Sequence, residues 1–278
     1  MDTPGAMREA SRRWRNSGRS IGLVPTMGAL HAGHLSLVDL ARRENDVVVV
    51  SLFVNPLQFG PNEDFRRYPR DPDRDAQLLA EAEVDALYRP STEIMYPSGA
   101  STRVSVSGVA EPMEGAARPG HFEGVATVVT KLFGAVEPDR AYFGQKDAQQ
   151  VAVVKQLVKD LDLGVEIRVG PIVREPDGLA LSSRNVYLSV DERKAALALS
   201  QALRGATEAY SAGQRGVKEL KKLMHARLSA EPLVRAEYAE IVDPDTFRSP
   251  GHLAVVAARV GKTRLIDNHD LTQPFDLR

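Results

Sequence analysis

The strongest constraint on the fold is a pair of apolar segments separated by a glycine-containing turn and a helical pattern. Residues 21–26 (IGLVPT) are mostly apolar, and residues 47–54 (VVVVSLFV) are β-branched and almost continuously apolar. Between them, Leu37, Leu40 and Ala41 share one helix face by their i, i+3, i+4 spacing. The order strand, turn, helix, strand is typical of a βαβ unit, whose parallel strands are covered on both faces.

The alternation of strands and helices continues to about residue 170. The pattern predicts strands at 84–88, 140–143 and 165–169 and helices at 73–82, 122–136 and 148–161. Right-handed crossovers place the intervening turns at the carboxyl ends of the strands, where open α/β sheets bind ligands. We therefore predict an α/β fold with a Rossmann-like parallel sheet and helices on both faces.

A second, smaller domain is predicted beyond Pro171. Helical spacing occurs at 191–210 and 217–229, and strand patterns occur at 235–242, 253–260 and 262–267. Two helices with about three strands are typical of an α+β domain. A boundary at Pro171 or at 176–178 divides the chain into domains of residues 1–172 and 173–278.

The composition excludes several classes of protein. The 278 residues are 43% hydrophobic, and 36 basic residues nearly cancel 37 acidic ones, which does not favour a nucleic-acid partner. The absence of cysteine excludes disulfide scaffolds, thiolate catalysis and Cys-ligated metals. No apolar run reaches the roughly 18 residues of a membrane span. Residues 1–18 are charged where a signal peptide requires an apolar core. We expect a cytoplasmic protein without a membrane partner.

The turn after the first predicted strand lies in PTMGALHAGHLSLV (25–38). His31 and His34 share a face if both lie in the first helical turn, and Gly28 and Gly33 allow close backbone approach. Helix N-terminal amides and the macrodipole favour anions, so the segment indicates a polyphosphate site. A zinc site would need a third ligand, and its usual i, i+4 histidine pair with a glutamate is absent. Core or surface histidines are the simpler interpretation.

Two further polar segments follow predicted strands. FVNPLQFG (53–60) places Asn55 and Gln58 at the carboxyl edge of the sheet, where an uncharged amide can orient a hydroxyl or carboxylate. FGQKDAQQ (143–150) places Lys146 at a helix start, where the dipole disfavours a cation and thus favours an anionic partner. A turn-capping glutamine and a solvated lysine are the simpler interpretations.

Several motifs together resemble a known family. His-x-Gly-His after a strand is similar to the signature of the nucleotidylyltransferase superfamily, and PTMGALHAGH resembles that of the pantothenate synthetase (pantoate–β-alanine ligase) family. FVNPLQFG, YPRDPDRD (68–75), RPGHFEGVATVV (118–129), FGQKDAQQ and GLALSSRNVYLS (178–189) extend the resemblance. Ala32 replaces a usually larger residue and Gln145 a usual glutamate, and we expect both positions to tolerate this.

The resemblance implies a two-step, AMP-forming ligase. The carboxylate of pantoate attacks the α-phosphate of ATP to give pantoyl adenylate and pyrophosphate, and the amine of β-alanine then displaces AMP to give pantothenate. No protein nucleophile is required, in agreement with a chain that lacks cysteine. The resemblance also implies Mg²⁺ with ATP, a homodimer, an ATP- and pantoate-binding domain at 1–172 and a lid domain at 173–278.

The resemblance further implies roles for individual residues. Contacts to the phosphates are implied for His31, His34, Lys146, Ser182, Ser183 and Arg184. Other ATP contacts are implied for Pro25, Met27, Gly144, Asp147, Val173 and Leu181, and pantoate contacts for Asn55, Gln58, Val128, Val129 and Gln150. Asp73 or Asp75 could support magnesium through water, although acidic residues at a helix start are usually caps.

Three other functions share part of this pattern. A coenzyme-pathway adenylyltransferase would have both histidines, but it would need basic residues for a phosphorylated acceptor where this chain has Gln58 and Gln150. An aminoacyl-tRNA synthetase needs a tRNA-binding surface, which a net charge of -1 does not favour. A non-catalytic nucleotide sensor would not need Lys146 or the loop at 178–189. Pyrophosphate exchange that depends on pantoate separates these alternatives from the ligase.

Overall fold

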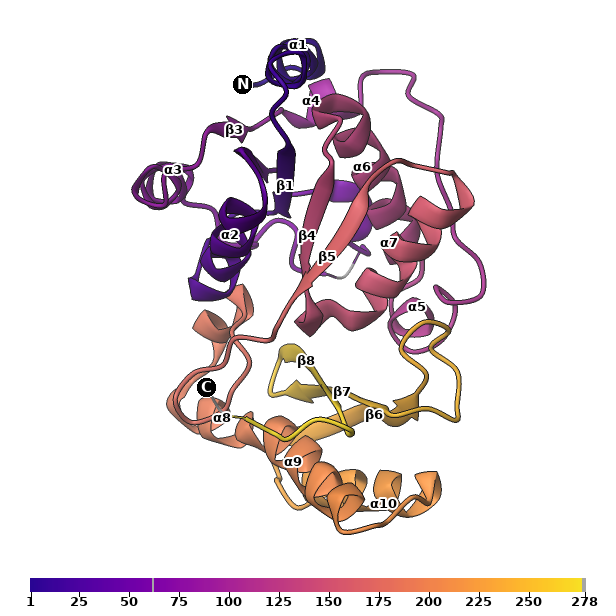
Figure 1. The fold of residues 1–278 in the computed structure, drawn as a ribbon. Helices are drawn as coiled ribbons and strands as arrows, with labels where there is room; N and C mark the ends of the chain where they lie inside the picture. The colour runs from indigo at the N-terminus through magenta and orange to yellow at the C-terminus, as the bar shows by residue number, and fades with distance from the viewer. Residues whose placement is uncertain (62, 277–278) are drawn as a thin grey trace. The chain divides into compact units, whose positions relative to one another are not determined.

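The computed structural model describes residues 1–61 and 63–276, which form two compact units (Figure 1). Unit 1 comprises Met1–Gly144 and Val153–Gly170, and unit 2 comprises Gln145–Ala152 and Pro171–Arg278. None of the helices in the described part of the chain is both long and apolar enough to cross a membrane.

Unit 1 is built on a five-stranded parallel sheet in the order β3-β2-β1-β4-β5. The strands are β1 (Ile21–Thr26), β2 (Val47–Leu52), β3 (Ala86–Tyr88), β4 (Arg140–Gly144) and β5 (Glu166–Gly170). Central β1 pairs with β2 on one side and β4 on the other, so the direction of strand addition reverses between β1 and β4. Such a switch point is where α/β sheets form a ligand crevice at the carboxyl ends of the strands.

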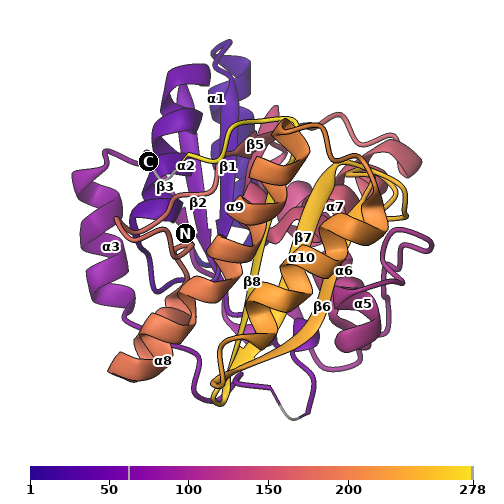
Figure 2. The ribbon, with the colours of Figure 1, turned by 90° about the horizontal axis from the view of Figure 1, so that it is seen from below.

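Helices cover both faces of this sheet (Figure 2). The helices of this part of the chain are α1 (Pro4–Asn16), α2 (Ala32–Glu44), α3 (Pro72–Glu81), α4 (Thr92–Met95), α5 (Glu114–Ala117), α6 (His121–Val136) and α7 (Ala148–Asp160), which begins in unit 2. Helix α2 packs on one face against Val24, Val48 and Val50. Helices α1 and α6 pack together against β1. Two short 3-10 turns follow strands, η1 (Pro56–Gln58) after β2 and η2 (Gln145–Asp147) after β4.

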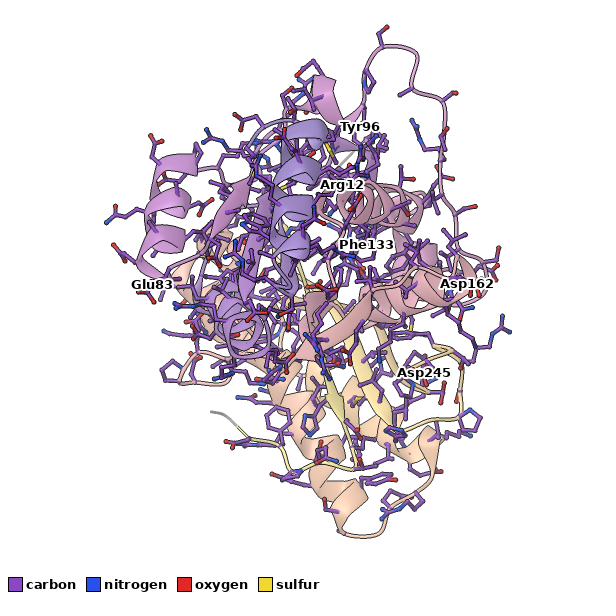
Figure 3. The ribbon with its side chains drawn as sticks, turned by 45° about the horizontal axis from the view of Figure 1, so that its top comes forward. Arg12, Glu83, Tyr96, Phe133, Asp162 and Asp245 are labelled. Atoms are coloured by element: carbon purple, nitrogen blue, oxygen red, sulfur yellow. The ribbon has the colours of Figure 1, made fainter. Side chains whose placement is uncertain are left out.

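Helix α1 is not predicted by the sequence patterns above, which identify only a charged N-terminal segment. Its buried face consists of Met7, Ala10 and Ser11, at helical spacing. Arg8 donates two hydrogen bonds, at 3.0 and 2.8 Å, to the carbonyl of Gly134 near the carboxyl end of α6. A cation is favourable at that end of a helix. Figure 3 labels Arg12 of α1 and Phe133 of α6 on these two helices.

Unit 2 contains an antiparallel sheet in the order β6-β7-β8. Its elements are β6 (Val234–Val242), β7 (Leu253–Val260), β8 (Thr263–Asp270), η3 (Ser183–Tyr187), α8 (Val190–Ala195), α9 (Leu197–Ser211) and α10 (Val217–Ser229). Helices α9 and α10 pack on one face of the sheet (Figure 2), where Leu203, Met224 and Val256 are fully buried. Across the strands, Glu237 pairs with Arg259 at 2.9 Å and with Arg264 at 2.7 Å.

The predicted fold class, a parallel sheet with helices on both faces and a smaller α+β part, is confirmed. The single helix predicted at 191–210 is two helices, because α8 ends at Ala195 and a tight turn at Ala196 precedes α9. A further difference is that Gln145–Ala152 belongs to unit 2, although it follows β4 directly. The helical spacing of apolar residues in the sequence does not indicate with which unit a turn packs.

We predict that α1 is an integral part of the core of unit 1. Met7→Ala should lower the free energy of unfolding by about 2–5 kcal/mol, because Met7 is fully buried. Arg13→Ala on the same helix removes only an exposed i, i+4 pair with Glu9 and should cost less than about 0.5 kcal/mol. Urea unfolding of both variants measures the difference, and equal costs would show that α1 is a surface appendage.

Candidate active site

The turn between β1 and α2 presents two histidines at the start of a helix. His31 is the N-cap of α2, and His34 is the third residue of the helix. The Nδ1 atom of His31 accepts the N–H of Gly33 at 3.2 Å, and the Nδ1 atom of His34 accepts the N–H of His31 at 3.4 Å. The ring centroids lie 4.1 Å apart. The two side chains therefore form a capping box, a motif more commonly made by serine and glutamate.

These hydrogen bonds determine which ring nitrogen of each histidine carries the proton. Because Nδ1 accepts a main-chain N–H, the neutral imidazole has its hydrogen on Nε2, which is then a donor. The rings lie at the end of α2 where main-chain amides and the helix dipole favour negative charge. The predicted pairing of His31 and His34 on one helical turn is confirmed by this geometry.

Asp75 of α3 fixes the conformation of the same turn. Its side chain is 2% exposed, and its two oxygens accept the N–H groups of Ala29 at 2.9 Å and Leu30 at 2.8 Å. Ala29 has a left-handed backbone with φ 52°, a conformation that costs an alanine about 1 kcal/mol. At Gly28, with φ 84°, a Cβ atom would lie 2.8 Å from Asp75 Oδ2. The close approach of the carboxylate thus requires glycine.

The position of Asp75 also bears on the magnesium site considered from the sequence. Its two carboxylate oxygens bind main-chain amides in the protein interior, so they do not face a solvent-filled site. Within residues 1–61 and 63–276, no group of three or more His, Cys, Asp or Glu side chains could hold a metal ion. The Asp75 carboxylate therefore serves the histidine turn in this structure.

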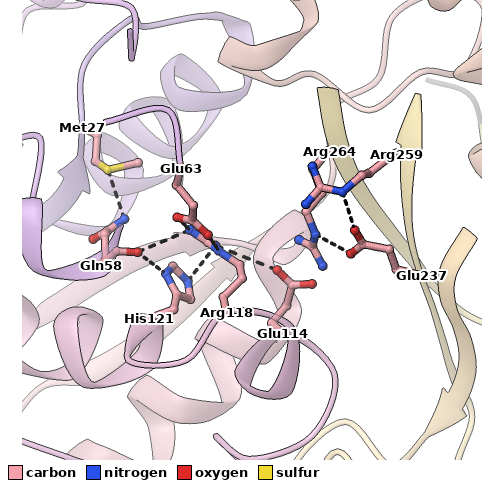
Figure 4. A network of polar contacts seen from close by, with 9 residues as sticks. All are labelled: Met27, Gln58, Glu63, Glu114, Arg118, His121, Glu237, Arg259 and Arg264. Carbon is pink, nitrogen blue, oxygen red and sulfur yellow. Dashed lines mark hydrogen bonds and ion pairs between the residues drawn. The ribbon is translucent and has the colours of Figure 1, made fainter. Parts of the chain in front are cut away.

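Gln58, in the turn η1 after β2, lies in a buried polar cluster (Figure 4). Its Nε2 atom donates to Met27 Sδ at 3.1 Å, and its Oε1 atom accepts from Asn55 Nδ2 at 3.1 Å. Asn55 is 1% exposed, donates to the carbonyl of Gly124 at 3.0 Å and accepts from the Tyr96 hydroxyl at 2.8 Å. These contacts join the turn after β1, through Met27, to the turn after β2.

Helix α6 approaches η1 closely at Gly124. A Cβ atom there would lie 2.5 Å from the carbonyl of Leu57 and 2.6 Å from the amide nitrogen of Gln58. Val128 follows one helical turn later on the same face, and Val129 is its neighbour in sequence. Both valines are buried. The η1 turn therefore packs against α6 near an apolar part of that helix.

A second group of polar side chains holds the backbone of Gln58 (Figure 4). Arg118 donates to both carboxylate oxygens of Glu63, at 2.7 and 2.8 Å. His121 Nδ1 lies 2.9 Å from the carbonyl of Gln58, and His121 Nε2 lies 3.1 Å from Arg118 Nη1. Burial, reinforced by the charge of Arg118, lowers the pKa of His121 to about 4. The neutral ring can thus donate to Gln58 and accept from Arg118.

Arg118, His121 and Glu63 are supporting residues to which the sequence patterns assign no role. Arg118 and His121 belong to the RPGHF segment, which stands out in the sequence only for its resemblance to a family motif. The only feature of the sequence that could have indicated them is a cluster of polar residues directly before a strongly apolar helix. Glu63 lies in a loop and carries no signal.

In unit 2, the turn η2 carries Lys146 and Asp147. The Nζ atom of Lys146 lies 3.6 Å from Asp147 Oδ1, and the Lys146 side chain is 21% exposed. Lys146 precedes α7 in a 3-10 turn and does not lie in its first helical turn. Gln150 lies in the first turn of α7.

The predicted phosphate loop of unit 2 follows a short hairpin. The N–H of Leu181 donates to the carbonyl of Val173 at 3.0 Å, which brings these two predicted ATP contacts together. Ser182 caps η3, and its Oγ atom accepts the N–H of Arg184 at 3.2 Å. Asn185 Nδ2 donates to the carbonyl of Ala180 at 3.1 Å and stabilises the loop.

The remaining predicted residues of unit 1 lie at the carboxyl edge of the sheet. Pro25 is the last residue but one of β1, and Gly144 ends β4, which pairs with β1. Within unit 1 the structure thus brings together Met27, Asn55 and Gln58, with the histidine pair following Met27 in the chain. The binding roles of all these residues stay predictions.

Comparison with known proteins identifies the family. The sequence model of the family "Pantoate-beta-alanine ligase" matches residues 1–270. The chain belongs to the pantoate-beta-alanine ligase family. The chain is 53% identical to the pantothenate synthetase of Acetivibrio thermocellus over 96% of this chain and 97% of that protein. It is 56% identical to the pantothenate synthetase of Chloroflexus aurantiacus strain J-10-fl over 89% of this chain and 90% of that protein.

Solved structures of the family agree with this assignment. Pantothenate synthetase from Thermus thermophilus superposes with a TM-score of 0.92 at 50% identity, covering 98% of each chain. Pantoate-beta-alanine ligase from Francisella tularensis, in complex with "Beta-gamma ATP and Beta-alanine", superposes with a TM-score of 0.81 at 37% identity, covering 99% of this chain and 98% of that one. The resemblance stated from the sequence motifs is confirmed, and the chain is an ATP-dependent ligase of pantothenate biosynthesis.

We predict that position 124 tolerates only glycine. Gly124→Ala should destabilise unit 1 by about 1–3 kcal/mol, because its Cβ atom would overlap the backbone of η1. Gly134→Ala in the same helix has open space at the Cβ position and should stabilise the helix by up to about 1 kcal/mol. Thermal unfolding of the pair checks this, and a stabilised Gly124→Ala variant would contradict the close approach.

The lowered pKa of His121 predicts a dependence of stability on pH. The unfolded chain takes up the proton near pH 6.5 and the native chain only near pH 4, so stability falls as the pH drops through this window. Between about pH 7.5 and 5.5 His121 should contribute a loss of about 1 kcal/mol. His121→Asn, which can still donate to Gln58, should lose this contribution. Urea unfolding of both proteins at both pH values tests it; identical pH dependence would contradict a buried neutral ring.

Proposed function

We propose that this chain joins pantoate to β-alanine in two steps through pantoyl adenylate. In the first step a carboxylate oxygen of pantoate bonds to the α-phosphorus of ATP, and the bond from that phosphorus to the bridging oxygen of pyrophosphate breaks. In the second step the amine of β-alanine bonds to the acyl carbon, AMP leaves with the electron pair of the anhydride bond, and the amine loses a proton. The first step requires stabilisation of charge that develops on phosphate oxygens.

The observation that carries this proposal is the pair of histidines at the β1–α2 turn. Their Nδ1 atoms accept main-chain N–H groups, so their Nε2–H groups are donors fixed at the N-terminus of α2. Donors fixed before the substrate binds need no reorganisation during the reaction, which is how electrostatic preorganisation lowers a barrier. We assign His31 and His34 to the phosphates of ATP.

The amide cluster of unit 1 supports an assignment to pantoate. Gln58 is uncharged, so it can orient the carboxylate nucleophile without neutralising it. Its contacts with Asn55 and Met27 hold its rotamer, because both polar atoms of the amide have a partner. We assign Asn55 and Gln58 to the polar groups of pantoate, and the buried Val128 and Val129 to its two methyl groups. Gln150 of unit 2 is assigned to pantoate as a second uncharged amide.

The remaining assignments concern unit 2 and the adenosine part of ATP. Lys146, Ser182, Ser183 and Arg184 are assigned to the phosphates, for which an ammonium and a guanidinium offer charge and several donors. Gly144 and Asp147 are assigned to the ribose. Pro25, Met27, Val173 and Leu181 are assigned to the rest of the nucleotide. These roles follow from the family motifs, to which the residues correspond position by position.

We further propose that Mg²⁺ enters with ATP, bound by phosphate oxygens and water. Magnesium commonly keeps several water ligands and binds nucleotides in this manner, and the engaged oxygens of Asp75 agree with it. A homodimer in the cytoplasm is proposed from the family resemblance.

The experiment that tests the proposal isolates the first step. Exchange of labelled pyrophosphate into ATP should require pantoate and proceed without β-alanine. Lys146→Ala should lower the exchange rate about 100- to 1000-fold, the size expected for loss of one charge-stabilising group. Lys155→Ala, an exposed lysine further along α7, serves as the matched control and should leave the rate unchanged. Normal exchange by Lys146→Ala would refute the assigned role, and exchange without pantoate would refute the reaction.

A further inference from the structure

Asn268 of β8 is a buried amide whose polar atoms all bind one turn. Asn268 is 2% exposed. Its Nδ2 atom donates to the carbonyls of Gln145 and Lys146, each at 2.9 Å, and its Oδ1 atom accepts from Gln145 Nε2 at 3.1 Å. All three contacts lie within unit 2. Asparagine is depleted in strands, so a buried asparagine in β8 calls for an explanation beyond strand stability.

The two carbonyls define how Lys146 is held. The carbonyl of Gln145 belongs to the peptide unit before the Cα atom of Lys146, and the carbonyl of Lys146 belongs to the peptide unit after it. Rotation of these two peptide planes about the Cα atom is the φ and ψ freedom of Lys146. One side-chain amide that binds both carbonyls therefore fixes both dihedral angles, and with them the direction in which the lysine side chain leaves the backbone.

Asn268 is itself held in place by a buried ion pair. The neighbouring Asp267 accepts from Arg174 at 2.6 and 3.0 Å, and both side chains are almost fully buried. Asp267 Oδ1 also accepts the N–H of Asn268 at 2.8 Å. The guanidinium of Arg174 in turn lies over the ring of Phe275 at 4.9 Å. The backbone that presents the Asn268 amide thus has little freedom to shift.

We propose that Asn268 is a positioning residue for the first step of the reaction and acts through Lys146. The inference rests on the proposed role of Lys146 at the phosphates. Misplacement of a reacting or charge-stabilising group by about 1 Å can cost roughly 100-fold in rate, so a residue that sets the backbone of Lys146 controls that rate without contacting substrate. Gln145 contributes to the same arrangement, because its side-chain amide fills the remaining acceptor of Asn268.

The test removes the hydrogen bonds while keeping a branched side chain of similar shape. Asn268→Leu should lower kcat for pantoate-dependent pyrophosphate exchange about 10- to 100-fold. Asn268→Asp changes the shape less and, while ionised, cannot donate to the two carbonyls. It serves as the second variant if the leucine variant folds poorly. Gln145→Ala removes only the third contact and should change kcat less than about threefold. Thr207→Val removes a buried hydrogen bond in α9 and serves as the control for lost stability alone.

A double-mutant cycle with Lys146→Ala separates positioning from general destabilisation. If Asn268 acts through Lys146, then Asn268→Leu should lower the residual rate of Lys146→Ala by less than about threefold. An equal fold-loss in both backgrounds would overturn the positioning role alone, since it would show that Asn268 does not act through the lysine. An unchanged rate in Lys146→Ala by itself would overturn the assigned role of Lys146 and the positioning role together. The two failures are therefore distinguishable.

Discussion

The conformation of the β1–α2 turn depends on one buried carboxylate. Asp75 accepts the amides of Ala29 and Leu30 and holds Ala29 in a left-handed conformation that alanine otherwise avoids. This turn ends at His31, which starts α2, and begins at Met27, which contacts Gln58. A single side chain from α3 therefore supports both the amino-terminal end of α2 and the amide cluster beside it.

A buried side chain that binds main-chain groups also occurs at the other turns that carry candidate residues. Asn55 caps η1 and donates to the carbonyl of Gly124, and Asn268 binds two carbonyls of η2. In each case a buried side chain satisfies main-chain groups that a turn leaves without partners, which would otherwise cost free energy in the interior. Each of these turns is thereby held by a buried side chain as well as by its own main chain.

Most of the fold could be predicted from local patterns. The apolar run at 47–54 and the helical spacing after Gly33 correspond to β2 and α2 within about two residues. The histidine pair and the amides of Asn55 and Gln58 could also be found, because each follows a strand directly. Local patterns did not indicate α1, whose buried face is three small or flexible residues among arginines.

The supports of the site could not be predicted in the same way. Asp75 lies 45 and 46 residues from the amides it binds, and Asn268 lies 122 and 123 residues from its carbonyls. No periodicity links such positions, so Asp75 resembled a cap or a metal ligand in the sequence. Only the folded chain reveals which main-chain groups these residues face.

A histidine as the N-cap of a helix combines two tasks in one side chain. The Nδ1 atom of His31 accepts the N–H of Gly33 and caps α2, while Nε2 on the opposite side of the ring carries the hydrogen of the neutral imidazole. Serine or asparagine could cap α2 in place of His31, but neither side chain would supply the N–H donor of the imidazole ring. An exchange at this position therefore removes an N–H donor at the start of α2 even where it preserves the helix cap.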